Sequence, residues 1–191
     1  MGGMSRVIFN TATSLNGFIA DEDNSLDWLF AVEPPESELH ERFMSHIGVF
    51  VQGSTTYEWV LAHEELLAAP EKWTTFYGDR PTFVFTSRDL PKPEGADVRF
   101  VSGRVQDAFP DMLRAAQQRE TGSDIWVVGG GDLAAQFLDV GLLDEIEVSI
   151  APVFLAGGAP LLPRRVEADR LRLREVSMHG QFASLKYDVV K

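Results

Sequence analysis

Three consecutive glycines, Gly129 to Gly131, separate an apolar run from a helical pattern in the stretch DIWVVGGGDLAAQF, residues 124–137. Glycine loses more conformational freedom on folding than any other residue, so a triplet is costly unless the backbone requires it. Either the turn is tight and the helix packs closely, or a ligand approaches the backbone too closely for a Cβ atom. A buried strand that passes through such a turn into a helix is typical of α/β proteins.

The rest of the chain alternates in the same way. Apolar, β-rich runs predict strands over 6–13, 48–53, 80–88, 96–101, 124–129 and 142–154. The intervening stretches predict a long loop over 21–38 and helices near 37–46, from about Thr55, over 105–120 and over 133–141. The segment 171–190 alternates as two strands around His179-Gly180. We expect one α/β domain over 1–191, with a central sheet buried on both faces and a C-terminal antiparallel hairpin.

Composition excludes several classes of function. The chain has 17 basic and 29 acidic residues, a net charge of −12, and a surface this acidic repels nucleic acid. There is no cysteine, and the four histidines form no H-E-x-x-H motif, so no metal site is predicted. Neither a targeting signal nor a membrane-spanning run is recognisable, which predicts a cytoplasmic protein without a membrane partner.

The glycine triplet is suited to a phosphate group, because it precedes a helix whose free N–H groups and positive dipole end favour an anion. Gly129, Gly131 and Ala134 even satisfy a loose G-x-G-x-x-A pattern. A classical dinucleotide fold carries this motif in its first strand–helix turn, with an acidic residue about twenty positions later, and neither condition is met. The motif alone therefore leaves both explanations of the glycines open.

Two other predicted strand ends carry similar chemistry. Gly53 is followed by Ser54-Thr55-Thr56, although Thr55 and Glu58 also fit a helix capping box, which is a purely structural explanation. Another strand ends in Thr86-Ser87-Arg88, whose hydroxyl groups and guanidinium could hold a phosphate monoester or simply be solvated. Ligands of open α/β sheets bind beyond the carboxyl ends of the strands, so the three ends together favour a phosphate-bearing ligand.

These stretches resemble the dihydrofolate-reductase-like fold, and specifically the reductase domain of bacterial riboflavin biosynthesis and its stand-alone relatives. The resemblance rests on residues 11–20, 48–59, 81–91 and 125–162 and on the closing hairpin. It implies a three-layer α/β/α domain with a mixed, mostly parallel sheet. It also implies an NADPH-dependent reductase acting on a pyrimidine- or pteridine-type molecule. The alternatives are a dihydrofolate or pterin reductase, a non-catalytic NADPH-binding module of the same fold, and a structural domain without a dinucleotide site.

The resemblance also implies roles for individual residues. The glycine triplet would surround the pyrophosphate and nicotinamide ribose together with Asp132 and Leu133. A second group would hold the adenosine ribose and its 2′-phosphate, namely Thr86, Ser87 and Arg88. The remaining cofactor residues implied are Gly53, Ser54, Thr55 and Thr56 at the second strand end, and Ala12, Gly17, Ile19 and Ala20 beside the nicotinamide.

The chain departs from the family pattern near the active-site mouth. Asn16 stands where the family often has aspartate, and Ser54 where an arginine is frequent, which leaves Arg88 as the principal partner of the 2′-phosphate. Asp27 is the candidate proton donor, and Asn16 and Trp28 are candidates for substrate contact. For a phosphate on the substrate, the nearest basic pair is Arg164-Arg165.

Residues 151–163, APVFLAGGAPLLP, are unusually apolar for a solvated connection. An internal loop packed on its own sheet is one explanation. The resemblance adds a second, a homodimer built around the neighbouring C-terminal strands.

Overall fold

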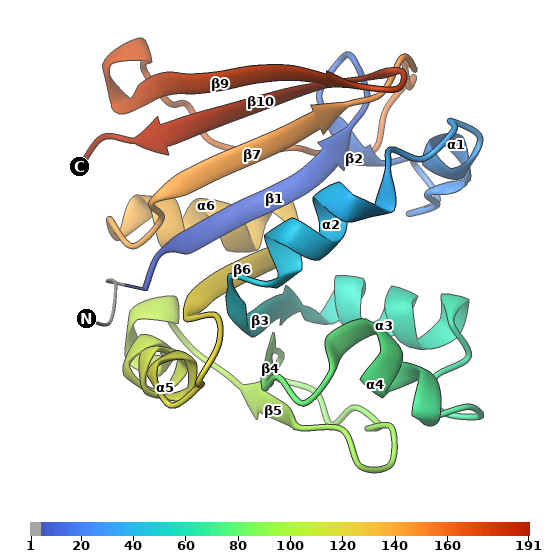
Figure 1. The fold of residues 1–191 in the computed structure, drawn as a ribbon, viewed down its shortest axis with the longest axis vertical. Helices are drawn as coiled ribbons and strands as arrows, with labels where there is room; N and C mark the ends of the chain where they lie inside the picture. The colour runs from blue at the N-terminus through green and yellow to red at the C-terminus, as the bar shows by residue number, and fades with distance from the viewer. Residues whose placement is uncertain (1–4) are drawn as a thin grey trace.

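An eight-stranded mixed sheet runs through the part of the chain, residues 5–191, that the computed structural model describes (Figure 1). Its strand order is β5-β4-β3-β6-β1-β7-β10-β9. The first six strands in this order run parallel to one another, and β10 and β9 pair antiparallel at one edge. The predicted fold class is therefore confirmed. The strands are β1 (Val7–Thr13), β3 (Ile47–Gly53), β4 (Thr82–Phe85), β5 (Val98–Val101), β6 (Asp124–Gly129), β7 (Glu145–Ile150), β9 (Leu171–His179) and β10 (Phe182–Val189).

Helices cover both faces because the central strands are apolar on both sides. In β3, Phe50 belongs to the hydrophobic cluster under α3 (Ser54–His63) and α4 (Glu71–Tyr77), where α2 (Ser37–Met44) also packs. Its neighbours Val49 and Val51 belong to the opposite cluster, under α5 (Val105–Gln117) and α6 (Gly131–Asp139). This alternation produces the layers of Figure 1. No helix within residues 5–191 has the length and apolarity needed to cross a membrane.

The observed elements differ from the predicted ones at several points. Helix α4 was not predicted, because its sequence EKWTTFY has weak helix propensity and forms by burying Trp73 and Tyr77. The loop over 21–38 contains a short helix α1 (Asp27–Phe30), and a 3₁₀ turn, Ala168–Arg170, precedes β9. The strand predicted over 142–154 is confined to β7. A second small sheet pairs β2 (Phe18–Ala20) with β8 (Ala159–Pro160).

Candidate functional site

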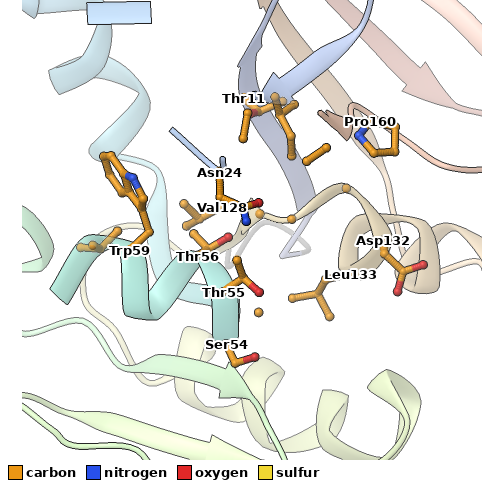
Figure 2. A pocket seen from close by; sticks show the side chains of 18 of the residues that line it. Thr11, Asn24, Ser54, Thr55, Thr56, Trp59, Val128, Asp132, Leu133 and Pro160 are labelled. Atoms are coloured by element: carbon orange, nitrogen blue, oxygen red, sulfur yellow. The ribbon is translucent and has the colours of Figure 1, made fainter. Parts of the chain in front are cut away.

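A cavity of about 690 Å³ opens where β1, β3 and β6 end (Figure 2). These strands are parallel neighbours, so their carboxyl ends meet at one edge of the sheet, as ligand sites in such folds require. The predicted cofactor residues that line the cavity are Ala12, Ile19, Ala20, Gly53, Ser54, Thr55, Thr56, Gly129, Gly130, Gly131, Asp132 and Leu133. The predicted residues outside this lining are Gly17, Thr86, Ser87 and Arg88 for the cofactor, and Asn16, Asp27 and Trp28 for substrate and catalysis.

Two helix N-termini point at this cavity. Helix α3 starts directly after Gly53 and α6 directly after Gly130, and both of these N-cap residues are extended. The first-turn N–H groups of a helix have no carbonyl partner within the helix, and the dipole places partial positive charge there. Two such ends on adjacent strands make a site suited to the phosphates of a dinucleotide.

The glycines of the triplet are required for different reasons. A Cβ atom on Gly131 would lie 2.5 Å from the carbonyl oxygen of Pro160 and equally close to that of Leu161, so this glycine is required by the fold itself. A Cβ atom on Gly130 would meet no protein atom within 4 Å. Gly130 lines the cavity, so the space beside it is available to a ligand. Close packing of the chain therefore explains Gly131, and Gly130 is left with the open space that a ligand at the backbone would need.

The capping box predicted at the start of α3 is wrong. The N-cap is Gly53, no side chain caps the helix, and Thr55 lies within its first turn. Glu58 instead binds Arg88, with 3.0 Å between Oε1 and Nη1 and a second contact between Oε2 and Nη2. The hydrogen bond to Glu58 raises the pKa of the exposed Arg88 above its ordinary value. The guanidinium is thus held by a carboxylate of this chain, beside the cavity and outside its lining.

Asn16 joins two loops. Its Oδ1 accepts hydrogen bonds from Ser14 Oγ (2.9 Å) and from Leu155 N (3.1 Å), and its Nδ2 donates to Leu155 O (2.7 Å). The amide therefore ties the turn after β1 to the apolar segment 151–163. This network explains the side chain without a substrate.

Helix α1 packs against α3 through aromatic rings. Phe30 stacks on His63 with 5.1 Å between ring centroids, and His63 stacks on Trp59 at 4.4 Å. Trp28 donates its Nε1–H to Ser25 O (3.2 Å), and Asp27 is exposed at the start of the helix. Trp59, on α3, lines the cavity, whereas Asp27 and Trp28, on α1, do not.

Sequence reasoning missed part of the lining, chiefly Asn24, Trp59 and Trp126. Asn24 has a positive φ of 57°, within a turn whose Asp21 Oδ1 accepts hydrogen bonds from the backbone N–H groups of Asp23 (2.9 Å) and Ser25 (2.7 Å). Asparagine tolerates this conformation better than most residues, so the stretch DEDNS carried a readable turn signal. Nothing local in the sequence marked the two tryptophans. Figure 2 shows Asn24, Trp59 and Thr56 on one side of the cavity and Asp132, Leu133 and Pro160 on the other.

Charge is nearly absent from the cavity. Among the described residues that line it, the single charged side chain is Asp132, in the first turn of α6. Asp132 Oδ1 lies 3.2 Å from Arg164 Nη1, and Arg164 Nε also pairs with Asp139 at 2.9 Å. The neighbouring Arg165 pairs with Glu167 at 2.5 Å. Both members of the predicted basic pair are therefore held by carboxylates and lie outside the lining.

Two known proteins resemble this chain over nearly its whole length. Uncharacterized protein YwjB of Bacillus subtilis is 31% identical over 183 residues, which cover 95% of this chain and 97% of YwjB. A crystal structure of a putative riboflavin biosynthesis protein from Shewanella sp. PV-4 superposes with a TM-score of 0.75 at 25% identity, over 98% of this chain and all of that one.

More distant structures share the fold alone. One is a diaminohydroxyphosphoribosylaminopyrimidine deaminase/5-amino-6-(5-phosphoribosylamino)uracil reductase from Thermotoga maritima, with a TM-score of 0.65 and 15% identity. It matches 98% of this chain and 57% of its own. The other is dihydrofolate reductase from Enterococcus faecalis complexed with NADP(H), with a TM-score of 0.59, 14% identity and 98% of each chain covered.

The sequence pattern, the strand order and the cavity agree with one family. Residues 5–181, nearly the whole chain, match the family described as RibD C-terminal domain. The chain belongs to the RibD C-terminal domain family, whose fold is that of dihydrofolate reductase.

Proposed function

We propose that the protein is an NADPH-dependent reductase that transfers a hydride to a pyrimidine- or pteridine-type small molecule. The observation that carries the proposal is the convergence of two helix N-termini on one cavity, with open space beside Gly130. The names of two neighbours of the same fold support it, one a dihydrofolate reductase complexed with NADP(H) and the other a 5-amino-6-(5-phosphoribosylamino)uracil reductase.

Different lining residues would bind different parts of the cofactor. The first turns of α3 and α6 would bind the phosphates of the cofactor, and Ala12, Ile19 and Ala20 would lie along its nicotinamide. Bound NADPH would supply the hydride, while this chain orients both partners and excludes water. The prediction that Asp27 donates the proton stays untested, and its exposed carboxyl group lies outside the lining.

Gly130→Val tests the cofactor site. A Cβ atom at position 130 meets no protein atom within 4 Å, and the valine side chain would occupy space that the cofactor needs. We therefore expect Kd for NADPH to rise by about 5- to 150-fold, or ~1–3 kcal/mol. Calorimetric titration measures the affinity, and a thermal melt shows whether the variant is folded. Unchanged NADPH affinity in a folded Gly130→Val protein would refute the cofactor assignment.

Gly131→Val is the matched comparison. Its Cβ atom would collide with the backbone of residues 160–161, so we expect this variant to lose thermal stability whether or not NADPH is present.

An activity assay separates a reductase from a module that binds the cofactor without turnover. A reductase oxidises NADPH when a suitable pyrimidine or pteridine is added, and a binding module does not.

A further inference from the structure

The cavity has two chemically different halves. The half formed by the glycine triplet and by the first turns of α6 and α3 carries the N–H groups suited to phosphate. The other half lies beyond the first turn of α3, against the turn at Asn24, and its walls are Asn24, Trp59, Val60, Trp126 and Val128. If the first half holds the cofactor, as proposed above, the second is the space left for the substrate.

We infer that the substrate of this site is an uncharged pyrimidine or pteridine that carries no phosphate. The inference rests on the proposed function, and it separates this chain from the Thermotoga maritima neighbour, whose name specifies a phosphoribosyl group. The deciding observation is that no arginine, lysine or histidine occurs among the described residues that line the cavity.

The arginines around the cavity do not compensate for this absence. Arg88 lies outside the lining and is the candidate partner of the cofactor's own 2′-phosphate, and Arg165 is paired with Glu167. Arg164 lies between Asp132 and Asp139, and its contact with Asp132 places it at the start of α6, in the half assigned to the cofactor. A phosphate in the substrate half would therefore be taken out of water without a cation, which is strongly unfavourable.

The side chains that are present suit a flat, neutral molecule. Trp59 is held in place by its stack on His63, and Trp126 by the hydrogen bond from its Nε1 to Asn10 O (3.0 Å). Both tryptophans line the cavity. Asn24 sits on a turn that Asp21 holds in place, and its amide can both donate to and accept from the polar edge of a heterocycle.

A matched pair of compounds tests the inference. We would titrate the protein loaded with NADP⁺, which cannot donate a hydride, with 5-amino-6-ribosylaminouracil and with its 5′-phosphate, by calorimetry at two ionic strengths. We expect the unphosphorylated compound to bind at least as tightly as the phosphate. Tighter binding of the phosphate by about tenfold or more, weakening at high salt, would show a cation in the site and overturn the inference.

Failure of both compounds to bind would also overturn it, because the uncharged one belongs to the class that the inference names. Failure of the protein to bind NADPH in the preceding titration would instead refute the proposed function. These two failures are therefore distinguishable.

A variant supplies the missing charge. Asn24→Lys places a cation at the substrate half, and we expect it to shift the ratio of the two dissociation constants toward the phosphate by about tenfold. Distortion of the turn affects both compounds and largely cancels in the ratio. Asp23→Asn, at an exposed neighbour outside the lining, makes the same change in net charge and should leave the ratio unaltered. Equal shifts in both variants would mean that position 24 does not face the substrate.

Discussion

At the scale of single residues, Arg88 already has a partner within the chain. The guanidinium expected to hold a 2′-phosphate is bound to Glu58 in this structure. Both groups are largely exposed, so the pair contributes little to stability. A phosphate dianion could replace the carboxylate as the partner of Arg88, and Glu58 would then act as its competitor.

Competition between Glu58 and the 2′-phosphate for Arg88 predicts opposite effects for two substitutions. Arg88→Ala should remove most of the preference for NADPH over NADH, because a hydrogen bond to a charged group contributes ~1.5–3 kcal/mol, or roughly 10- to 150-fold in affinity. Glu58→Gln should change the preference in the opposite direction, because the guanidinium is freed. Dissociation constants of both variants for both cofactors, at low and high salt, measure the effect. If neither substitution alters the NADPH-to-NADH ratio, Arg88 does not bind the 2′-phosphate.

Glu147 predicts a pH dependence of stability. Burial on β7, and then its hydrogen bond to Glu145, raises the pKa of Glu147 from 4.5 to about 7, although Lys186 Nζ lies 3.7 Å away. Glu145, only 1% exposed, is bound by Arg6 (2.8 Å) and Arg174. In the window from pH 4.5 to 7 the folded state holds a proton that the unfolded state has released, so stability falls as the pH rises through this window.

Glu147→Gln should remove this dependence. We expect the free energy of unfolding of the wild type to fall between pH 5 and pH 8 by about 1–3 kcal/mol more than that of the variant. Urea unfolding at both pH values provides the measurement. Parallel pH profiles for the two proteins would show that Glu147 titrates normally.

At the scale of elements, α1 depends on aromatic contacts for its position. Phe30 is 56% exposed and stacks against His63 and Trp59, and the helix buries none of its residues. Because Asn24 and Leu26 line the cavity just before α1, the position of this helix controls one wall of the site. An aromatic pair contributes ~0.5–1.5 kcal/mol beyond its buried area.

Phe30→Ala should therefore free the segment 21–36 without unfolding the protein. We expect faster proteolytic cleavage within this segment and a higher substrate KM, with the thermal midpoint almost unchanged. Phe76→Ala, at a similarly exposed phenylalanine on α4, is the control and should alter neither quantity. Equal protease resistance of the wild type and Phe30→Ala would show that the stack does not hold α1.

The difference between local sequence pattern and tertiary packing explains which elements could be predicted from the sequence. Strands β3 and β6 are continuous apolar runs and the hairpin alternates, so local pattern was sufficient for most of the sheet. Helix α4 depends on burial of Trp73 and Tyr77, which no local pattern reveals. In the site, Gly130 could be identified as a lining residue because three consecutive glycines are themselves a recognisable sequence pattern. The position of Trp59 could not be predicted, because an aromatic residue on a helix usually belongs to the core. Only tertiary packing brings Trp59 to the cavity.

For the molecule as a whole, the edge strand β9 is the feature that a monomer does not explain. Leu173, Val176 and Met178 are 51%, 62% and 82% exposed. They pair with Tyr187, Leu185 and Ala183 across the hairpin, so all three lie on one face of the sheet. Phe154, in the apolar segment 151–163, is 74% exposed as well. A sheet face with this much exposed apolar surface favours association, and we propose that it packs against a second copy of the chain.

Light scattering at micromolar concentration should accordingly give twice the chain mass of 21.2 kDa. Val176→Lys should weaken the dimer by at least about tenfold, or ~1.4 kcal/mol, because it would bury an unpaired charge at the contact. Leu67→Lys places the same charge on an equally apolar residue, 51% exposed, that lies outside β9, and it should leave the mass unchanged. A wild-type protein that is monomeric at these concentrations would refute the dimer. A dimer unaffected by Val176→Lys would place the interface elsewhere than on this face of β9.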